Sequence, residues 1–169
     1  MELAIDEFII DWHLSTNDEE RQAAESMIRL VKTKCHRLVF DYAYMSRFAK
    51  KLSNLERARK EDTYLTQVLV KRLRNLMFDS SKVRTCDGPQ VAELESIEDE
   101  FDRLVAKSAL CIQSENKLLI TTDSDLIKKA AVLKKYRVEI LTPERAEQLL
   151  TSSSGSSMVL DGSLGSPTN

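Results

Sequence analysis

The stretch 118–130, LLITTDSDLIKKA, decides the fold. Its first residues are apolar and β-branched, as in a buried strand, and the residues from Asp123 onward have the acidic start and basic end of a helix. Two carboxylates, Asp123 and Asp125, lie at the joint, although a single aspartate is enough to cap a helix. A strand that leads straight into a helix is the unit of an α/β protein, so this stretch predicts a parallel sheet with crossover helices.

The same order of strand and helix recurs along the chain. Apolar runs predict strands at 3–6, 37–40, 117–122 and 137–141. Helical spacing of apolar residues predicts helices at 15–34, 42–52, 53–78, 93–116 (one helix or two), 123–136 and 142–150. Gly88-Pro89 predicts a break over 79–90. We therefore expect a three-layer α/β/α sandwich with a central parallel sheet of about four strands.

Composition limits the number of domains and the class of protein. The chain has 169 residues, 42% of them hydrophobic, which is enough for one domain with a sizeable core over 1–150. The segment 151–169 is rich in Ser and Gly, and we expect it to be a disordered tail. No apolar run approaches the roughly 20 residues that span a bilayer, and the N-terminus has no secretory pattern, so we expect no membrane contact.

The cysteines favour a reducing compartment. Cys35, Cys86 and Cys111 are odd in number, far apart and without CxxC spacing. Such a pattern argues against a disulfide framework and against a structural zinc site. A cytoplasmic location is the resulting expectation.

Four aspartates are candidates for a metal site. Asp6, Asp123 and Asp125 follow predicted strands, and ligands of open parallel sheets bind at the carboxyl ends of strands. Asp102 begins a predicted helix that could bring it to the same edge. Clustered carboxylates repel one another unless a cation neutralises them, and oxygen ligands suit Mg²⁺ or Mn²⁺. The alternatives are helix caps for Asp123 and Asp125, and a solvated acidic run around Asp102.

These motifs resemble those of the PIN-domain nucleases over most of residues 2–150. The chain has, in the order of that family, a strand ending in Asp ("LAID"), a helix opening with Asp ("DRLVAKSA") and a Thr-x-Asp-x-Asp-Leu-like motif ("ITTDSDLI"). The resemblance implies that Asp6, Asp102 and Asp123 are catalytic metal ligands, with Asp125 as the fourth acid. It also implies metal-dependent hydrolysis of single-stranded RNA, with a toxin of a toxin–antitoxin pair as one form of this function.

Two differences from the family pattern support an alternative. Asp6 is followed by Glu7 and Phe8 where the family has Thr and Asn, and Arg47 falls where it has an acid. A cation at that position is the wrong sign for a metal ligand, but it could hold a phosphate. The alternative function is a degenerate PIN-like module that binds RNA or a protein partner without cleavage. An antitoxin partner and a homodimer are expectations from the resemblance alone.

A basic segment supplies candidate contacts to RNA. The candidates are Arg47, Lys50, Lys51, Arg57, Arg59 and Lys60. They could follow a phosphate backbone, with Tyr42, Tyr44 or Tyr64 stacking on unpaired bases. The alternative is a solvated basic helix face. His13 and His36 lie apart in the sequence and show neither metal nor triad spacing, so we expect both to be structural or exposed.

Overall fold

A sheet of five parallel strands forms the centre of the molecule in a computed structural model, which describes residues 1–58 and 64–152. The strand order is β3-β2-β1-β4-β5, and every neighbouring pair is parallel. The strands are β1 (Glu2–Ile5), β2 (Arg37–Asp41), β3 (Val83–Cys86), β4 (Lys117–Ile120) and β5 (Val138–Leu141).

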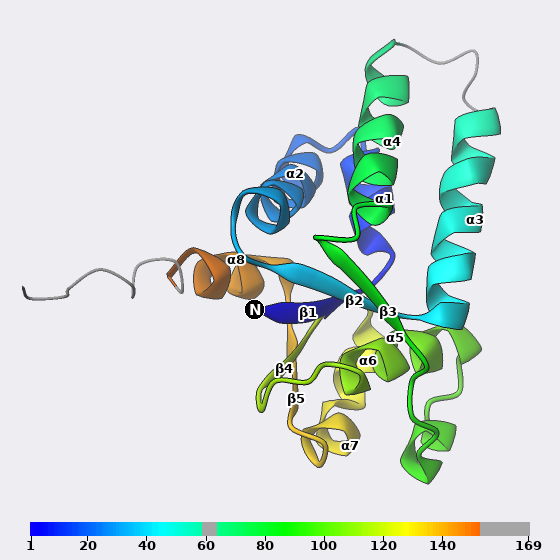
Figure 1. The fold of residues 1–169 in the computed structure, drawn as a ribbon, viewed down its shortest axis with the longest axis vertical. Coiled ribbons are helices and arrows are strands. Elements are labelled where there is room, and N and C mark those ends of the chain that lie inside the picture. The colour runs from blue at the N-terminus through cyan, green and yellow to red at the C-terminus, as the bar shows by residue number, and fades with distance from the viewer. Residues whose placement is uncertain (59–63, 153–169) are drawn as a thin grey trace, which may run out of the picture.

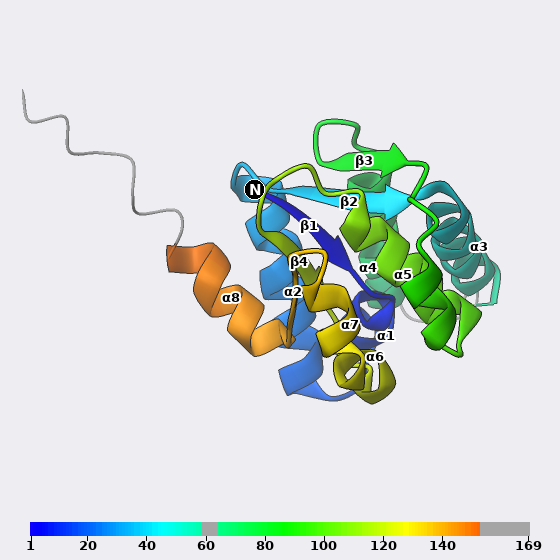
Figure 2. The same ribbon diagram turned by 90° about the horizontal axis from the view of Figure 1, so that it is seen from below.

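Helices cover both faces of this sheet. They are α1 (Phe8–His13), α2 (Asp18–Thr33), α3 (Tyr42–Ala58), α4 (Tyr64–Met77), the 3₁₀ helix η1 (Ala92–Ser96), α5 (Glu100–Leu110), α6 (Ser124–Lys128), α7 (Ala130–Lys134) and α8 (Pro143–Ser152). Figures 1 and 2 show α2 and α4 on one side of the sheet and α5 and α7 on the other. The α/β class and the three-layer arrangement predicted from the sequence are therefore confirmed.

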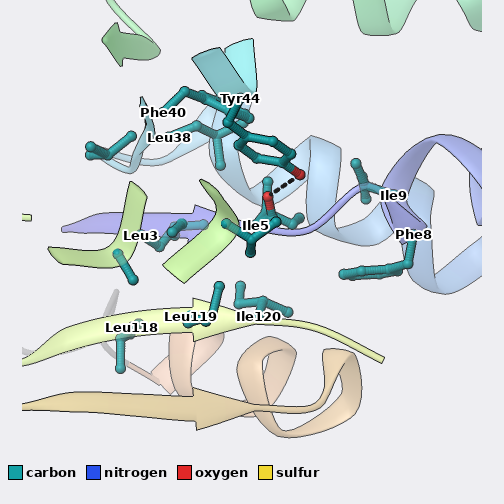
Figure 3. Close-up of a cluster of buried hydrophobic side chains, with 14 of the residues drawn as sticks. Leu3, Ile5, Phe8, Ile9, Leu38, Phe40, Tyr44, Leu118, Leu119 and Ile120 are labelled. Atoms are coloured by element: carbon teal, nitrogen blue, oxygen red, sulfur yellow. Dashed lines mark hydrogen bonds between the residues drawn. The ribbon is translucent and has the colours of Figure 1, made fainter. Parts of the chain in front are cut away.

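β1 lies in the middle of the sheet, and its sequence explains why. Leu3, Ala4 and Ile5 are each at most 2% exposed, as expected for a strand that is covered on both faces. Leu3 pairs with Leu38 of β2 on one side and with Leu118 of β4 on the other. Figure 3 shows these side chains within the buried hydrophobic cluster between the layers. The chain runs from β1 to β2 and β3 on one side and then crosses to β4 and β5 on the other, which makes the carboxyl ends of β1 and β4 a topological switch point.

The sheet has one strand more than the sequence predicted. β3 lies within 79–90, where we expected only a break. Of its four residues only Val83 is buried, because β3 is an edge strand, so it lacks the apolar run that reveals β1 and β4. This strand is defined by its pairing with β2, which begins at Leu38↔Val83, and not by its composition.

The predicted start of the helix 53–78 was wrong. α3 continues to Ala58, and a separate helix, α4, begins at Tyr64. α6 and α7 likewise replace one predicted helix. The proposed tail is described only at 151–152, which end α8, and 153–169 lie outside the described residues.

A disulfide joins Cys86 at the end of β3 to Cys111 just after α5, with Cα atoms 6.4 Å apart. The cysteine pattern argued against a disulfide framework, and for Cys86 and Cys111 that interpretation was wrong. The two cysteines are 25 residues apart and have no motif spacing, and the packing of α5 on β2, the strand next to β3, brings them together. Arg84 strengthens the same junction, since its guanidinium donates to the Cys111 carbonyl at 3.0 Å and pairs with Glu2. None of the described helices is long and apolar enough to cross a membrane.

Candidate functional site

Asp6 lies at the switch point, directly after β1, and is 6% exposed. Its Oδ2 accepts a 2.7 Å hydrogen bond from the Thr121 hydroxyl, and its Oδ1 accepts one from the Glu7 backbone N–H. Burial raises the pKa of Asp6, and the charges of Glu7 and Asp123 raise it further against these two hydrogen bonds. Asp6 is thus a fixed, strongly desolvated carboxyl group at the carboxyl edge of the sheet.

Thr121 connects Asp6 with the next acid. Its hydroxyl oxygen accepts a 2.9 Å hydrogen bond from the Asp123 N–H while the hydroxyl donates to Asp6. Asp123 itself caps α6, because its Oδ1 accepts from the backbone N–H groups of Asp125 and Leu126 at 2.7 and 2.9 Å. The capping interpretation of Asp123 is therefore confirmed. Its Oδ2 accepts no hydrogen bond from the residues that the structure describes, so a cap and a ligand are compatible roles.

Asp102 reaches the same edge from the first turn of α5. Its pKa is raised to about 6, first by burial and then by the charges of Asp123, Asp99, Asp6 and Asp125 in that order. Each of these acids lies close enough to disfavour the ionised form of Asp102. The carboxyl ends of β1 and β4 and the start of α5 therefore bring four predicted acids, Asp6, Asp102, Asp123 and Asp125, into one electrostatic neighbourhood.

Asp125 is the outermost of the four. Its side chain is 75% exposed and forms a 2.8 Å ion pair with Lys128, and this hydrogen bond is the main reason that its pKa is lowered. The structure thus places Asp125 at the rim of the acidic cluster, consistent with an outer position.

The donor set limits the kind of cation that could bind. Within 1–58 and 64–152, no three His, Cys, Asp or Glu side chains are placed to hold one metal ion together. Mg²⁺ commonly uses only one or two carboxylates and completes its shell with waters and substrate phosphates. The free oxygens of Asp102 and Asp123 fit that pattern, whereas both oxygens of Asp6 already accept hydrogen bonds.

A basic cavity of about 410 Å³ lies on one side of the acidic cluster. Its lining residues are Glu7, Arg47, Lys50, Lys51, Asn54, Leu55 and Phe101. Arg47 pairs with Glu100 at 2.8 Å, and Lys51 bridges Glu7 and Asp11 at 3.1 and 2.9 Å. Lys50 has no ion-pair partner in the described part of the chain. Three of the predicted RNA contacts, Arg47, Lys50 and Lys51, thus border the site, whereas Arg57 is exposed in the last turn of α3 and lines no cavity described here.

A second cavity of about 520 Å³ lies on the other side, between α5 and α6. Its lining residues are Ile97, Glu98, Asp99, Asp102, Asp125, Lys128 and Lys129. Asp102 is therefore open to a cavity that also contains two lysines. Arg59 and Lys60, the remaining predicted RNA contacts, lie outside the described residues.

The tyrosine predictions have different outcomes. Tyr42 is 57% exposed at the start of α3, beside the carboxyl end of β2, and is accessible to a base. Tyr44 is completely buried, so the prediction that it stacks on a base was wrong. Its backbone position three residues after Asp41 turns its ring into the core. The side chain of Tyr64 lies outside the description.

Some residues of the site were not predicted. Thr121 has no acidic side chain, and only its place between β4 and Asp123 signals its role. Asp99 caps α5 through the N–H groups of Phe101 and Asp102, and it belonged to an acidic run that concealed it. Asp41 caps α3, because its Oδ1 accepts from the Ala43 N–H at 2.8 Å. It also accepts from the Gly88 N–H at 2.9 Å.

Gly88 is required at that contact. A Cβ atom on Gly88 would lie 2.7 Å from Lys107 Cβ and 2.8 Å from Asp41 Oδ2, closer than real contacts allow. The backbone of the loop after β3 therefore packs directly against α5 and the end of β2. Both carboxyl oxygens of Asp41 accept structural hydrogen bonds, from Ala43 and Gly88. His13 and His36 are both buried and line neither of the two cavities beside the acidic cluster.

Comparison of the chain with protein-family models, with curated proteins and with solved structures gives no match.

Proposed function

We propose that this chain is a metal-dependent endoribonuclease of the PIN type that cleaves single-stranded RNA. The observation that carries the proposal is the convergence of Asp6, Asp102 and Asp123 at the ends of β1 and β4 and the start of α5, where burial and the neighbouring acids raise the pKa of Asp102 to about 6. Repulsive carboxylates destabilise a fold, and they concentrate at sites where a cation or a reaction uses them. The sequence motifs around Asp6, Asp102 and Asp123 support the same function.

The chain's own residues supply the positions and charges for such chemistry. At pH 7 a carboxyl with a pKa of about 6 is mostly ionised, so Asp102 can accept a hydrogen bond from an attacking water. The Thr121 hydroxyl donates to the carboxylate of Asp6, and its oxygen accepts from the Asp123 N–H, so this one side chain fixes both acids. Mg²⁺ or Mn²⁺, held through Asp102 and Asp123, would lower the pKa of water and stabilise charge on the phosphate.

Cations on both sides of the acidic cluster would contact the RNA backbone. Arg47, Lys50 and Lys51 line one cavity, and Lys128 and Lys129 line the other. An RNA strand that passes between the two cavities would place a phosphate beside Asp102. The exposed ring of Tyr42 would offer a surface on which a base could stack. A cytoplasmic location, a toxin role with an antitoxin partner and a homodimer accompany the proposal as expectations from the motifs. In a reducing cytoplasm Cys86 and Cys111 would be thiols.

The second candidate function is a PIN-like module that binds RNA or a protein without cleavage. Two observations favour it. Arg47 is engaged by Glu100 where the family has an acid, and no three acids within the described ranges are placed to share one cation. Both functions use the same surface, so a measurement of RNA cleavage, rather than of RNA binding, distinguishes them.

Cleavage of a labelled single-stranded RNA tests the proposal. Wild type is compared with Asp102→Asn and Asp123→Asn, each with Mn²⁺, Mg²⁺ or EDTA. Asp87→Asn is the matched control, because Asp87 is exposed just after β3, at the same sheet edge but outside the cluster. We expect metal-dependent cleavage by wild type and Asp87→Asn, and a loss of at least about 100-fold in the other two, since metal ligation and base catalysis each contribute at this scale.

Other outcomes separate the two functions. RNA that binds but stays intact with every metal supports the binding module and contradicts the nuclease. Cleavage that persists in Asp102→Asn and Asp123→Asn contradicts the acidic cluster as the site and points to a contaminating nuclease.

A further inference from the structure

A groove of about 610 Å³ lies between α2 and α4, away from the acidic cluster. Figure 1 shows the two helices on the same side of the sheet, with α1 behind α4. The lining residues are His13, Gln22, Glu25, Ser26, Ile28, Arg29, Lys32, Thr33 and Arg72. None of them belongs to the acidic cluster or to the two cavities beside it. The volume lies within the range of small-molecule pockets.

The groove is positively charged. Arg29 and Lys32 come from α2 and Arg72 from α4, so cations border it on both helices. None of these three side chains has an ion-pair partner among the residues that the structure describes. Glu25 is the single acid in the lining. Three cations against one carboxylate leave an excess of positive charge in the lining, and a further acid beside it is Glu147, whose carboxylate accepts from the Ser26 hydroxyl.

His13 provides a buried polar group in the same lining. Its ring is 2% exposed, and Nε2 lies 3.3 Å from the Leu69 carbonyl, so Nε2 carries the proton if this contact is a hydrogen bond. Nδ1 has no hydrogen-bond partner in the described structure. Burial lowers the pKa of His13, and the charges of Glu25 and Arg72 both act on it, in opposite directions. The imidazole is therefore neutral at pH 7 and leaves the charge of the groove unchanged.

We propose that the groove between α2 and α4 binds a small phosphorylated molecule, with Arg29, Lys32 and Arg72 holding its phosphate oxygens. Guanidinium groups match phosphate through paired hydrogen bonds, and here two of them border one groove from different helices. The lining has no Phe, Tyr or Trp on which a base could stack, so it is suited to phosphate rather than to a single-stranded nucleic acid. The site is separate from the acidic cluster and does not depend on the proposed nuclease function.

Titration with pyrophosphate, and with inorganic phosphate, tests this site in the full chain. Binding is followed by amide NMR shifts and by calorimetry at constant ionic strength, with NaCl as the reference salt. We expect saturable shifts at α2 and α4, and an affinity about tenfold lower in Arg29→Gln and in Arg72→Gln, because each loses a charge-assisted hydrogen-bonding group. Arg145→Gln is the matched control, since Arg145 of α8 is also exposed and has no ion-pair partner in the described ranges.

Several results would overturn the proposal. One is the same set of shifts with NaCl, and another is an equal loss of affinity in Arg145→Gln, because both indicate general screening of charge. A third is that Arg29→Gln and Arg72→Gln weaken binding of single-stranded RNA but leave pyrophosphate binding unchanged, which would make the groove part of an RNA surface. RNA cleavage is measured in the same variants, and its loss or retention reports separately on the acidic cluster.

Discussion

The hydroxyl group of Tyr44 donates a 3.0 Å hydrogen bond to the backbone carbonyl of Ile5, the residue before Asp6. Figure 3 shows this bond within the hydrophobic cluster. The Tyr44 ring also packs edge-on against Phe101, the residue before Asp102, with ring centroids 5.2 Å apart. One buried side chain of α3 therefore contacts both the end of β1 and the start of α5, the two elements that carry Asp6 and Asp102.

Removal of this hydroxyl should weaken the fold at the acidic edge. We expect Tyr44→Phe to lower the free energy of unfolding by about 1 kcal/mol, the typical contribution of one hydrogen bond, measured by urea denaturation. Tyr42→Phe is the control, because Tyr42 is mostly exposed and its hydroxyl should contribute nothing measurable. An equal effect of the two substitutions would contradict a specific role of the bond to Ile5.

Replacement of Asp102 should stabilise the protein at neutral pH. Its folded pKa of about 6 exceeds the ordinary 3.8, so the folded state retains a proton that the unfolded state has lost. The stability that comes from this protonation is fully present below about pH 3.8 and is lost as the pH rises through about 6. We therefore expect Asp102→Asn to melt at a higher temperature than wild type at pH 7.5 without divalent cations, with little difference near pH 4. Asp87→Asn should follow wild type throughout.

Arg47 should affect RNA binding more than stability. It lines the basic cavity, and its ion pair with Glu100 is exposed, so water screens most of the attraction. We expect Arg47→Ala to weaken binding of single-stranded RNA and to reduce the salt dependence of the affinity, since one phosphate contact is lost. Arg74→Ala is the matched control, because Arg74 pairs with Glu56 at the same 2.8 Å distance but lies outside that cavity. Equal weakening by both substitutions would indicate a general effect of charge.

Reduction of the disulfide should destabilise the protein. Cys86 and Cys111 close a chain segment with a sequence separation of 25, for which the loop-entropy model gives about 3.5 kcal/mol. We expect reductant to lower the denaturation midpoint of wild type. It should do the same in Cys35→Ser, because Cys35 is not in the disulfide. The midpoint of Cys86→Ser, which cannot form the bond, should not change with reductant. Peptide mapping without reductant should recover the Cys86–Cys111 pair. A wild-type denaturation midpoint that does not change with reductant would contradict the Cys86–Cys111 disulfide.

Prediction of the fold from the sequence succeeded where burial leaves a repeating signal. β1 and β4 are covered on both faces, so they appear as apolar runs, and α2 lies within the predicted helix 15–34, with Asn17 as its cap and an acidic first turn. β3 and the Cys86–Cys111 bridge were missed for a common reason. Both depend on pairing between segments far apart in the sequence, which neither composition nor spacing records.

The acidic residues of the candidate site could be predicted from the sequence, but the hydrogen bonds and ion pairs around them could not. Strand ends and an expected helix start were enough to bring Asp6, Asp102 and Asp123 to one edge. The hydrogen bond from Thr121 to Asp6 could not be predicted, because a threonine after a strand has many possible partners. The ion pair of Arg47 with Glu100 depends on how α3 and α5 face each other, which is a property of the tertiary packing.

The central position of β1 also determines when the site can form during synthesis. Asp6 leaves the ribosome before Thr121, whose hydroxyl fixes it and lies 115 residues later in the chain. β1 has no partner on its second side until β4 has emerged, and pairing between such distant strands is slow. Until β4 has emerged, a nascent chain therefore carries a half-paired strand, and this is the stage at which chaperones would act.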